Sequence, residues 1–160
     1  MATRYETDFY GWTQEQAGKL RALLAERSNL DLDMENLAEE LEDMGRSNRA
    51  QLVNRLAELD EHLMKLAYSL LADPRRQWRN SVNGQRYSIK KKLLAKNPSL
   101  KRHLDEALVE AHEDALRVFT DDKLVHLQMN EPPGLCPFTI EQMLDDDWWP
   151  EAKAHPYVQD

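Results

Sequence analysis

The chain has 160 residues, of which 41% are hydrophobic and 31% are charged, and it contains only five glycines. This composition fits one soluble, mainly helical domain and argues against a disordered or all-β protein. The formal net charge is −8. Such a charge disfavours a general nucleic-acid binder, because neutralisation of phosphates by Lys and Arg supplies most of that affinity.

The ends of the sequence and its single cysteine limit the class of protein further. The N-terminus has no apolar run after a basic start, so we expect no secretory signal, no membrane span and a cytoplasmic location. We expect a single domain over residues 1–160, with loose ends at about 1–7 and 151–160. Cys136 is the only cysteine and has no neighbouring Cys or His. It is therefore predicted to be a small apolar residue in an ordered turn rather than a reactive thiol.

Helical periodicity dominates the first half of the sequence. Thr13 and Gln16 form a capping-box pattern, which predicts a first helix over about residues 13–27. A second helix is predicted for residues 33–72, because it begins with a good Asp N-cap. Its apolar residues recur at helical spacing: Leu37, Leu41, Met44, Leu52, Leu56, Leu59, Leu63, Leu66 and Leu70. A straight helix of this length would measure about 60 Å, so we expect a bend or break near Gly45.

The second half predicts shorter helices separated by prolines. A third helix is expected over about residues 78–96, and a fourth over 99–119. Residues 120–138 contain three prolines and a glycine and are predicted to form a long loop. A second capping box, Thr139 with Gln142, predicts a short fifth helix. The predicted fold class is therefore all-α, a helical bundle of about four to five helices with a long, bent second helix and a short C-terminal helix.

Carboxylates gather on two of these helices. Residues 30–45 hold seven acidic and no basic side chains, and residues 106–114 hold four more carboxylates. We call these two segments the acidic ridges. Facing ridges could supply oxygen ligands to a divalent cation, and the candidate ligands are Glu39, Glu40, His62 and Glu110. The Glu-x-x-His pairs of di-iron bundles are absent, which disfavours that class of site. We favour solvated surfaces, or ridges neutralised by a neighbouring basic helix.

The basic segment 74–104 has the opposite charge, with ten Lys or Arg and no acidic residue. Together with nearby aromatic rings it could bind phosphate or single-stranded nucleic acid. The candidates for anion binding are Arg75, Arg76, Arg79, Arg86 and Lys90. No recognition motif accompanies these residues, so we favour pairing inside the molecule. That interpretation predicts that the third helix lies beside the acidic ridges.

A histidine and a set of tryptophans each allow two interpretations. His62 borders the leucine stripe and could act as a general base. No motif places a Ser or Cys nucleophile near it, so we favour a hydrogen-bonded histidine at the core edge. Trp12, Trp148 and Trp149 either pack against the first helix and close the bundle, or form a surface for a partner. We favour packing against the first helix.

Several separated blocks resemble one bacterial family. They are Trp12, the acidic stretch 30–47, the segment 62–65, and the closing block 136–150, which reads Cys-Pro-Phe-Thr-Ile-Glu-Gln-Met-Leu-Asp-Asp-Asp-Trp-Trp-Pro. In this order they are similar to the family known as domain of unknown function 29, over nearly the whole chain. The resemblance implies a mainly helical bacterial domain. It transfers no catalytic residue, because the family has no established chemistry.

We therefore expect a small cytosolic helical module for protein interaction or regulation, and we lean against an enzyme. No cofactor is predicted. The expected partner is an unknown protein or a second copy of the chain, and nucleic acid is disfavoured. Two alternatives stay open. One is a metal-binding protein or small metal-dependent enzyme that uses helix carboxylates and a histidine. The other is anion or nucleic-acid contact by the basic segment 74–104.

Overall fold

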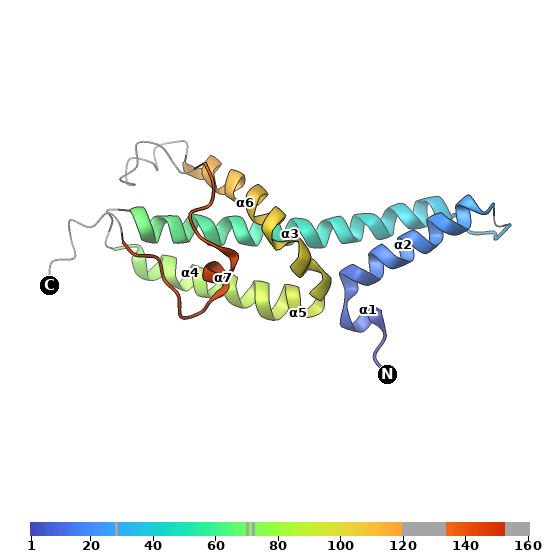
Figure 1. Cartoon of the computed structure of the whole chain (residues 1–160), viewed down its shortest axis with the longest axis horizontal. Helices are drawn as coiled ribbons and strands as arrows, with labels where there is room; N and C mark the ends of the chain where they lie inside the picture. Colours follow the sequence, from blue (N-terminus) through green and yellow to red (C-terminus); the bar gives the residue numbers. More distant parts are fainter. Residues whose placement is uncertain (28, 70, 72, 120–133, 153–160) are drawn as a thin grey trace.

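The computed structural model describes residues 1–27, 29–69, 71, 73–119 and 134–152, and the following account refers to them. Figure 1 shows an elongated all-α protein built along one long helix. This helix, α3, spans Met34–Tyr68 and contains 35 residues. At 1.5 Å per residue it is about 50 Å long. The other helices pack against its N-terminal and C-terminal halves.

The helix α3 begins at the predicted N-cap, since the Asp33 side chain accepts a hydrogen bond from the Asn36 backbone N–H at 3.3 Å. We predicted a bend or break near Gly45, and the helix continues through this residue without a break. A Cβ atom at Gly45 would lie 2.4 Å from Gln14 Nε2 and 3.0 Å from Thr13 Oγ1. The glycine therefore allows a close approach of the preceding helix to α3.

Two helices precede α3, namely α1 at Arg4–Thr7 and α2 at Phe9–Ala25. Residues 4–7, which we expected to be loose, form a helical turn with its own capping box. The helix α2 begins four residues earlier than predicted, because Asp8 caps it by accepting from the Gly11 backbone N–H. Thr13 is buried inside the helix instead, and its hydroxyl donates to Tyr10 O at 2.7 Å.

The elements after α3 follow the predicted order. The helix α4 spans Arg75–Tyr87, continues through a π-helical stretch at Ser88–Leu93 and ends in α5 at Leu94–Lys96. A 3₁₀-helical segment, Pro98–His103, leads into α6 at Leu104–Phe119. The short helix α7 spans Ile140–Leu144 and starts at the predicted capping box of Thr139 and Gln142. Residues 120–133 of the predicted loop and residues 153–160 of the predicted loose end lie outside the described residues.

The core lies between the C-terminal half of α3 and the helices α4 and α6. Five leucines of the predicted stripe are almost completely buried: Leu52, Leu56, Leu59, Leu63 and Leu66. They pack against apolar residues of α4, the π-helical stretch and α6, including Val82, Ile89 and Ala111. Each fully buried side chain of this size contributes about 1.5–3 kcal/mol by removal from water. We call this part of the molecule the body. Leu70, the last residue of the predicted stripe, lies outside the described residues.

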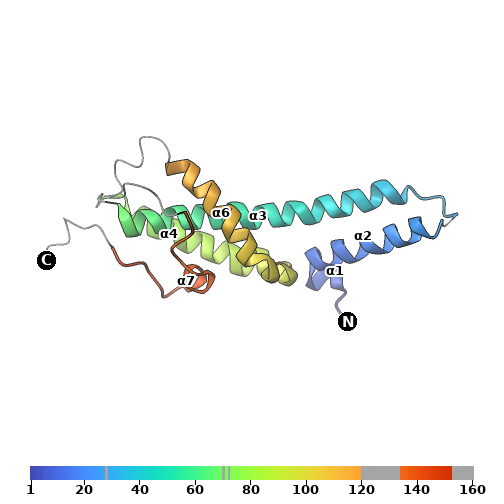
Figure 2. The ribbon, with the colours of Figure 1, turned by 45° about the horizontal axis from the view of Figure 1, so that its top comes forward.

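The N-terminal half of α3 packs against α2, and the other long helices lie at its opposite half (Figures 1 and 2). We call residues 9–45 the arm. Its base is tied to the body by polar contacts, since Asn97 Oδ1 accepts from the Tyr10 backbone N–H at 2.9 Å. Asp8 also accepts from the Ser99 hydroxyl and backbone N–H. Among the described helices, none has the length and apolar composition of a membrane span.

Candidate functional site

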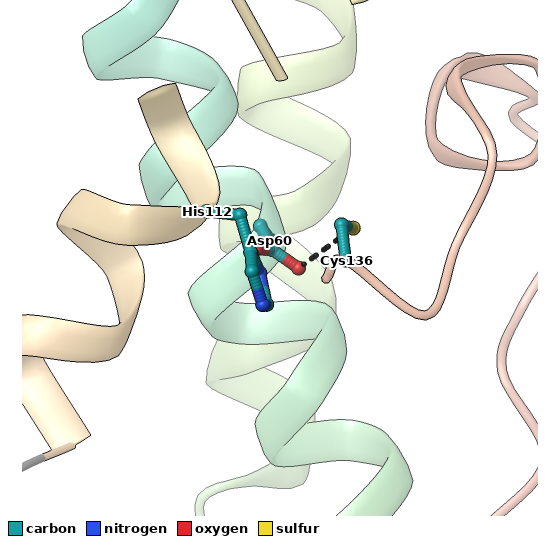
Figure 3. A group of neighbouring side chains, drawn as sticks. All are labelled: Asp60, His112 and Cys136. Atoms are coloured by element: carbon teal, nitrogen blue, oxygen red, sulfur yellow. Dashed lines mark hydrogen bonds and ion pairs between the residues drawn. The ribbon is translucent and has the colours of Figure 1, made fainter. Parts of the chain in front are cut away.

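Among the described residues, the buried Asp60 and His112 and the half-buried Cys136 form a group of chemically active side chains, called here the Asp–His–Cys cluster (Figure 3). Asp60 comes from α3, His112 from α6, and Cys136 from the segment that leads to α7. His112 Nδ1 lies 2.5 Å from Asp60 Oδ2. The Cys136 thiol donates to Asp60 Oδ1 at 3.3 Å. Both carboxylate oxygens are therefore engaged.

Asp60 occupies a position that the helix pattern reserves for an apolar residue. It lies four residues after Leu56 and three before Leu63, so all three share the buried face of α3. Its exposed fraction is 0%, and that of His112 is 2%. A carboxylate in such a place is costly unless it is paired and hydrogen-bonded. The two donors from α6 and from residue 136 provide that compensation and fix the approach of these segments to α3.

The environment of Cys136 decides which chemistry the cluster can perform. Burial, and to a smaller extent the neighbouring Asp60 carboxylate, raises the pKa of the Cys136 thiol to about 12. The thiol is therefore protonated near neutral pH and serves as a hydrogen-bond donor. Nucleophilic cysteine enzymes need the opposite, a thiolate formed at a lowered pKa. The cluster is thus unsuited to acyl transfer through a cysteine nucleophile.

A cavity of about 220 Å³ adjoins the cluster. His112 and Cys136 form part of its wall, together with apolar side chains of α6 such as Leu108. Asp105 and Glu113 also line it. The ligand atoms of the cluster all lie within 4.8 Å of one another. One oxygen, one nitrogen and one sulfur donor at this separation are a set that can bind a transition metal.

The metal ligands suggested by the sequence are not brought together. Glu39 and Glu40 are exposed on the arm, and 23 residues of the continuous helix α3 separate Glu39 from His62, which corresponds to about 35 Å. His62 donates from Nδ1 to the Glu58 carbonyl at 2.7 Å. This contact agrees with the interpretation of a histidine bonded at the core edge. Glu110 instead forms a two-point ion pair with Arg49, with distances of 3.0 and 2.7 Å.

Residues of the acidic ridges form ion pairs with arginines that lie outside the basic segment. Arg21 of α2 pairs with Glu42 at 2.9 Å, and Arg49 of α3 pairs with Glu110 at 2.7 Å. Within the described ranges, no Lys or Arg of residues 74–104 forms an ion pair with either ridge. The predicted neighbourhood of the third helix and the ridges is therefore wrong. The reason is that α4 packs against the C-terminal half of α3, beyond the acidic part.

The five candidates for anion binding have different surroundings. Arg86 is fully buried, and Arg75 donates to the Leu66 carbonyl at 2.6 Å. Lys90 pairs with Asp146 at 2.7 Å. The guanidinium carbon of Arg79 lies 5.1 Å from the centre of the Trp149 ring, and Arg76 is exposed. Most of these cations are already committed to contacts inside the molecule, so they do not form one shared basic groove.

The tryptophans also separate into two groups. Trp12 stacks on Phe9 and meets Tyr5 edge-on, with ring centres 5.8 and 4.9 Å apart. Trp148 packs against Phe138 at 5.5 Å, and Trp149 lies over the guanidinium of Arg86 at 4.9 Å. The predicted closure of the bundle against the first helix is therefore wrong. The C-terminal pair packs against α4 and the segment before α7.

The arm presents the second candidate site, an uncovered apolar surface. Leu37 and Met44 are 45% and 43% exposed, although they continue the stripe that is buried in the body. Other large apolar side chains of the arm are exposed as well. Together these residues form what we call the arm patch: Leu23, Leu24, Leu30, Leu32, Leu37 and Met44. Exposed large apolar side chains that gather on one part of a molecule can mark a site of contact with another macromolecule.

These observations define an all-α protein with a helical body, a buried Asp–His–Cys cluster and a two-helix arm. The chain belongs to the family described as Domain of unknown function DUF29, whose profile matches residues 4–149. It is also similar to an α-helical protein of unknown function from Rhodospirillum rubrum ATCC 11170, known from a crystal structure at 1.45 Å resolution. That match has 27% sequence identity and a TM-score of 0.69, and covers 92% of this chain and 93% of the other. A search of curated proteins gave no match.

Proposed function

We propose that the protein is a helical interaction module that associates with a second copy of itself through the arm. The observation that carries this proposal is the exposure of the arm patch on a hairpin of two helices. In the body, the same α3 stripe is covered by α4 and α6. On the arm, α2 covers only one side of α3, along the seam that contains Ala17, Met34 and Ala38.

The spacing of the patch suits a helical partner. Leu37, Leu41 and Met44 follow one another at steps of four and three residues, which is the spacing of knobs-into-holes packing between helices. Two hairpins that pack face to face produce a four-helix bundle. Two-fold pairing is also the commonest symmetry of homo-oligomers. A second arm is thus an occupant with the shape and apolar character that the patch requires.

The size of the arm sets the expected strength of the association. A face about 25 Å long and two helices wide covers about 500 Å² on each partner. The total of about 1,000 Å² is near the lower limit for a specific interface. The arm also carries nine carboxylates against three basic residues. Two paired arms would therefore repel each other at their rims, and we expect a weak dimer that becomes tighter as salt screens this repulsion.

Sedimentation equilibrium of the purified chain, over a range of protein and salt concentrations, tests the proposal. Leu37→Gln combined with Met44→Gln should shift the dimer to monomer, and the fold should survive because both side chains are exposed. Tyr87→Gln combined with Val109→Gln is the matched control, because these side chains are at least as exposed but belong to the body. The control should dimerise as the unmodified chain does.

Two outcomes would contradict the proposal. One is a chain that stays monomeric at every concentration and salt. The other is a dimer that the arm variant leaves intact or that salt dissociates. Dissociation by salt would point to attraction between the acidic arm and the basic segment 74–104 of another copy.

A further inference from the structure

We propose that the Asp–His–Cys cluster binds one Zn²⁺ ion through an Asp60 carboxylate oxygen, His112 Nδ1 and Cys136 Sγ, with the fourth coordination position open to the adjoining cavity. This site is independent of the arm. It also differs from the carboxylates and His62 that the sequence had suggested as metal ligands. The proposal follows from donor chemistry, geometry, charge and access.

The donor set selects the metal. Imidazole nitrogen, thiolate sulfur and carboxylate oxygen are the three ligand types that Zn²⁺ accepts in proteins. Hard cations such as Mg²⁺ and Ca²⁺ prefer oxygen ligands throughout, so a sulfur donor argues against them. The chain has one cysteine, which excludes an iron–sulfur cluster held by several thiolates of one copy.

The separations are close to those that a tetrahedral ion imposes. Zinc bonds of about 2.0–2.3 Å place neighbouring ligand atoms about 3.3–3.7 Å apart. The contact of Cys136 Sγ with Asp60 Oδ1 is 3.3 Å, and that of His112 Nδ1 with Asp60 Oδ2 is 2.5 Å. All of the ligand atoms lie within 4.8 Å. Shifts of about 1 Å in side chains would therefore suffice, while α3 and α6 keep their positions.

Charge balance favours a divalent ion in this buried place. On binding, the Cys136 S–H bond breaks, a sulfur–zinc bond forms and the proton leaves to solvent. The proton that His112 Nδ1 donates to Asp60 moves to Nε2, so that the neutral imidazole coordinates through Nδ1. Neither change alters an oxidation state. Two negative ligands, the Asp60 carboxylate and the Cys136 thiolate, then neutralise the two positive charges of the ion. A neutral complex avoids the cost of an uncompensated charge away from water.

The cavity gives the ion access and a free position. His112 and Cys136 both border it, and so do the acidic residues Asp105 and Glu113. Negative charge near its wall favours the approach of a cation. Three protein ligands with one open position are the arrangement of zinc sites that bind water or a small anion. The ligands also come from α3, α6 and the segment before α7. Metal binding would therefore hold these elements together.

Cobalt spectroscopy on the untagged full chain, freed of metal by a chelator, tests the site. One equivalent of Co²⁺ should produce a thiolate-to-cobalt charge-transfer absorption, and Zn²⁺ should abolish it by displacement. Because Cys136 is the only thiol, this absorption identifies the site without any variant. Cobalt binding without a thiolate band, or no binding at all, would overturn the proposal.

Variants give a second, independent readout by competition with a chromophoric zinc chelator. Cys136→Ser should weaken Zn²⁺ binding by more than about a hundredfold, since losing a ligand should exceed the 10–100-fold effect of losing an outer-shell partner. His62→Gln is the control for zinc held by a surface histidine, and it should bind as the unmodified chain does. Circular dichroism confirms that both variants are folded. Equal affinity in Cys136→Ser and the unmodified chain would place the ion elsewhere and refute the assignment.

Discussion

Arg86→Met should release the C-terminal segment from the body. Arg86 has an exposed fraction of 0%. Its Nε donates to the Met143 carbonyl at 2.7 Å, and its Nη2 donates to the carbonyls of Trp148 at 2.8 Å and Gln142 at 3.3 Å. The guanidinium also lies under the Trp149 ring. Methionine keeps much of the apolar stem but removes every one of these donors.

The expected loss follows from these contacts. Hydrogen bonds from a charged donor contribute about 1.5–3 kcal/mol each. The variant recovers part of this sum, because it no longer buries a charge and because released carbonyls regain water. Each carbonyl that stays buried without a donor costs about 1–3 kcal/mol, so with part of the sum recovered we expect a loss of about 3–5 kcal/mol in the free energy of unfolding. For a chain of this length it corresponds to a fall in Tm of roughly 10 °C.

Urea unfolding followed by circular dichroism and by tryptophan fluorescence measures this loss. Two of the four tryptophans, Trp148 and Trp149, lie in the C-terminal segment, so part of the fluorescence change should precede the loss of helical signal. Arg79→Met is the matched control on the same helix, because its exposed guanidinium lies 5.1 Å from the centre of the Trp149 ring and forms no hydrogen bond or ion pair with the residues that the structure describes. It should cost less than about 1 kcal/mol. Equal effects of the two substitutions would refute the assignment of Arg86 as the anchor of residues 139–150.

Two further substitutions test the base of the arm. Gly45→Val should lower the free energy of unfolding in urea by about 1–3 kcal/mol, because its Cβ would collide with Thr13 and Gln14. Gly18→Val is the control, because a Cβ at Gly18 has no atom within 4 Å. It should change the free energy of unfolding by less than about 0.5 kcal/mol. Asp8→Asn should cost about 1 kcal/mol at pH 7, because an amide nitrogen replaces one of the two oxygens that accept hydrogen bonds from Gly11 and Ser99. Burial alone would raise the pKa of Asp8, but hydrogen bonds from Ser99 and Gly11 and the charge of Arg4 outweigh it and hold that pKa below 3.8. Its contribution is therefore present above pH 3.8 and lost as the pH falls through the lowered value, so the two chains should converge in acid.

Much of the fold was predictable because helix signals are local. Each helix signal is recognised from residues only a few positions apart. Examples are the leucine stripe at positions 52–66, the prolines that end helices and the capping box at Thr139. The start of α2 was missed because both Asp8 and Thr13 satisfy the local pattern, and the distant Ser99 favours Asp8. The exposure of Leu37 and Met44 was missed for a related reason. A stripe predicts which face is apolar, while burial depends on whether another helix reaches it.

The Asp–His–Cys cluster could not be derived from spacing. Asp60 is 52 residues from His112 and 76 from Cys136 in the sequence. Sequence motifs for metal ligands recognise residues that share one helical turn or one loop, so they do not apply to a set so far apart. One signal was present, namely a carboxylate between Leu56 and Leu63 on an otherwise apolar face. A charged residue in that position calls for a partner elsewhere in the chain. The sequence alone does not say which histidine or thiol supplies it.

The continuity of α3 through Gly45 has a mechanical consequence. A break there would have formed a hinge, and the arm could then have swung without disturbing the core. An unbroken helix behaves instead as a strut, because bending it strains the hydrogen bonds of every turn along its length. In a pair joined at the arms, two such struts would hold the bodies apart at a fixed spacing and orientation. A small rotation at one body would then appear as a larger displacement at the other.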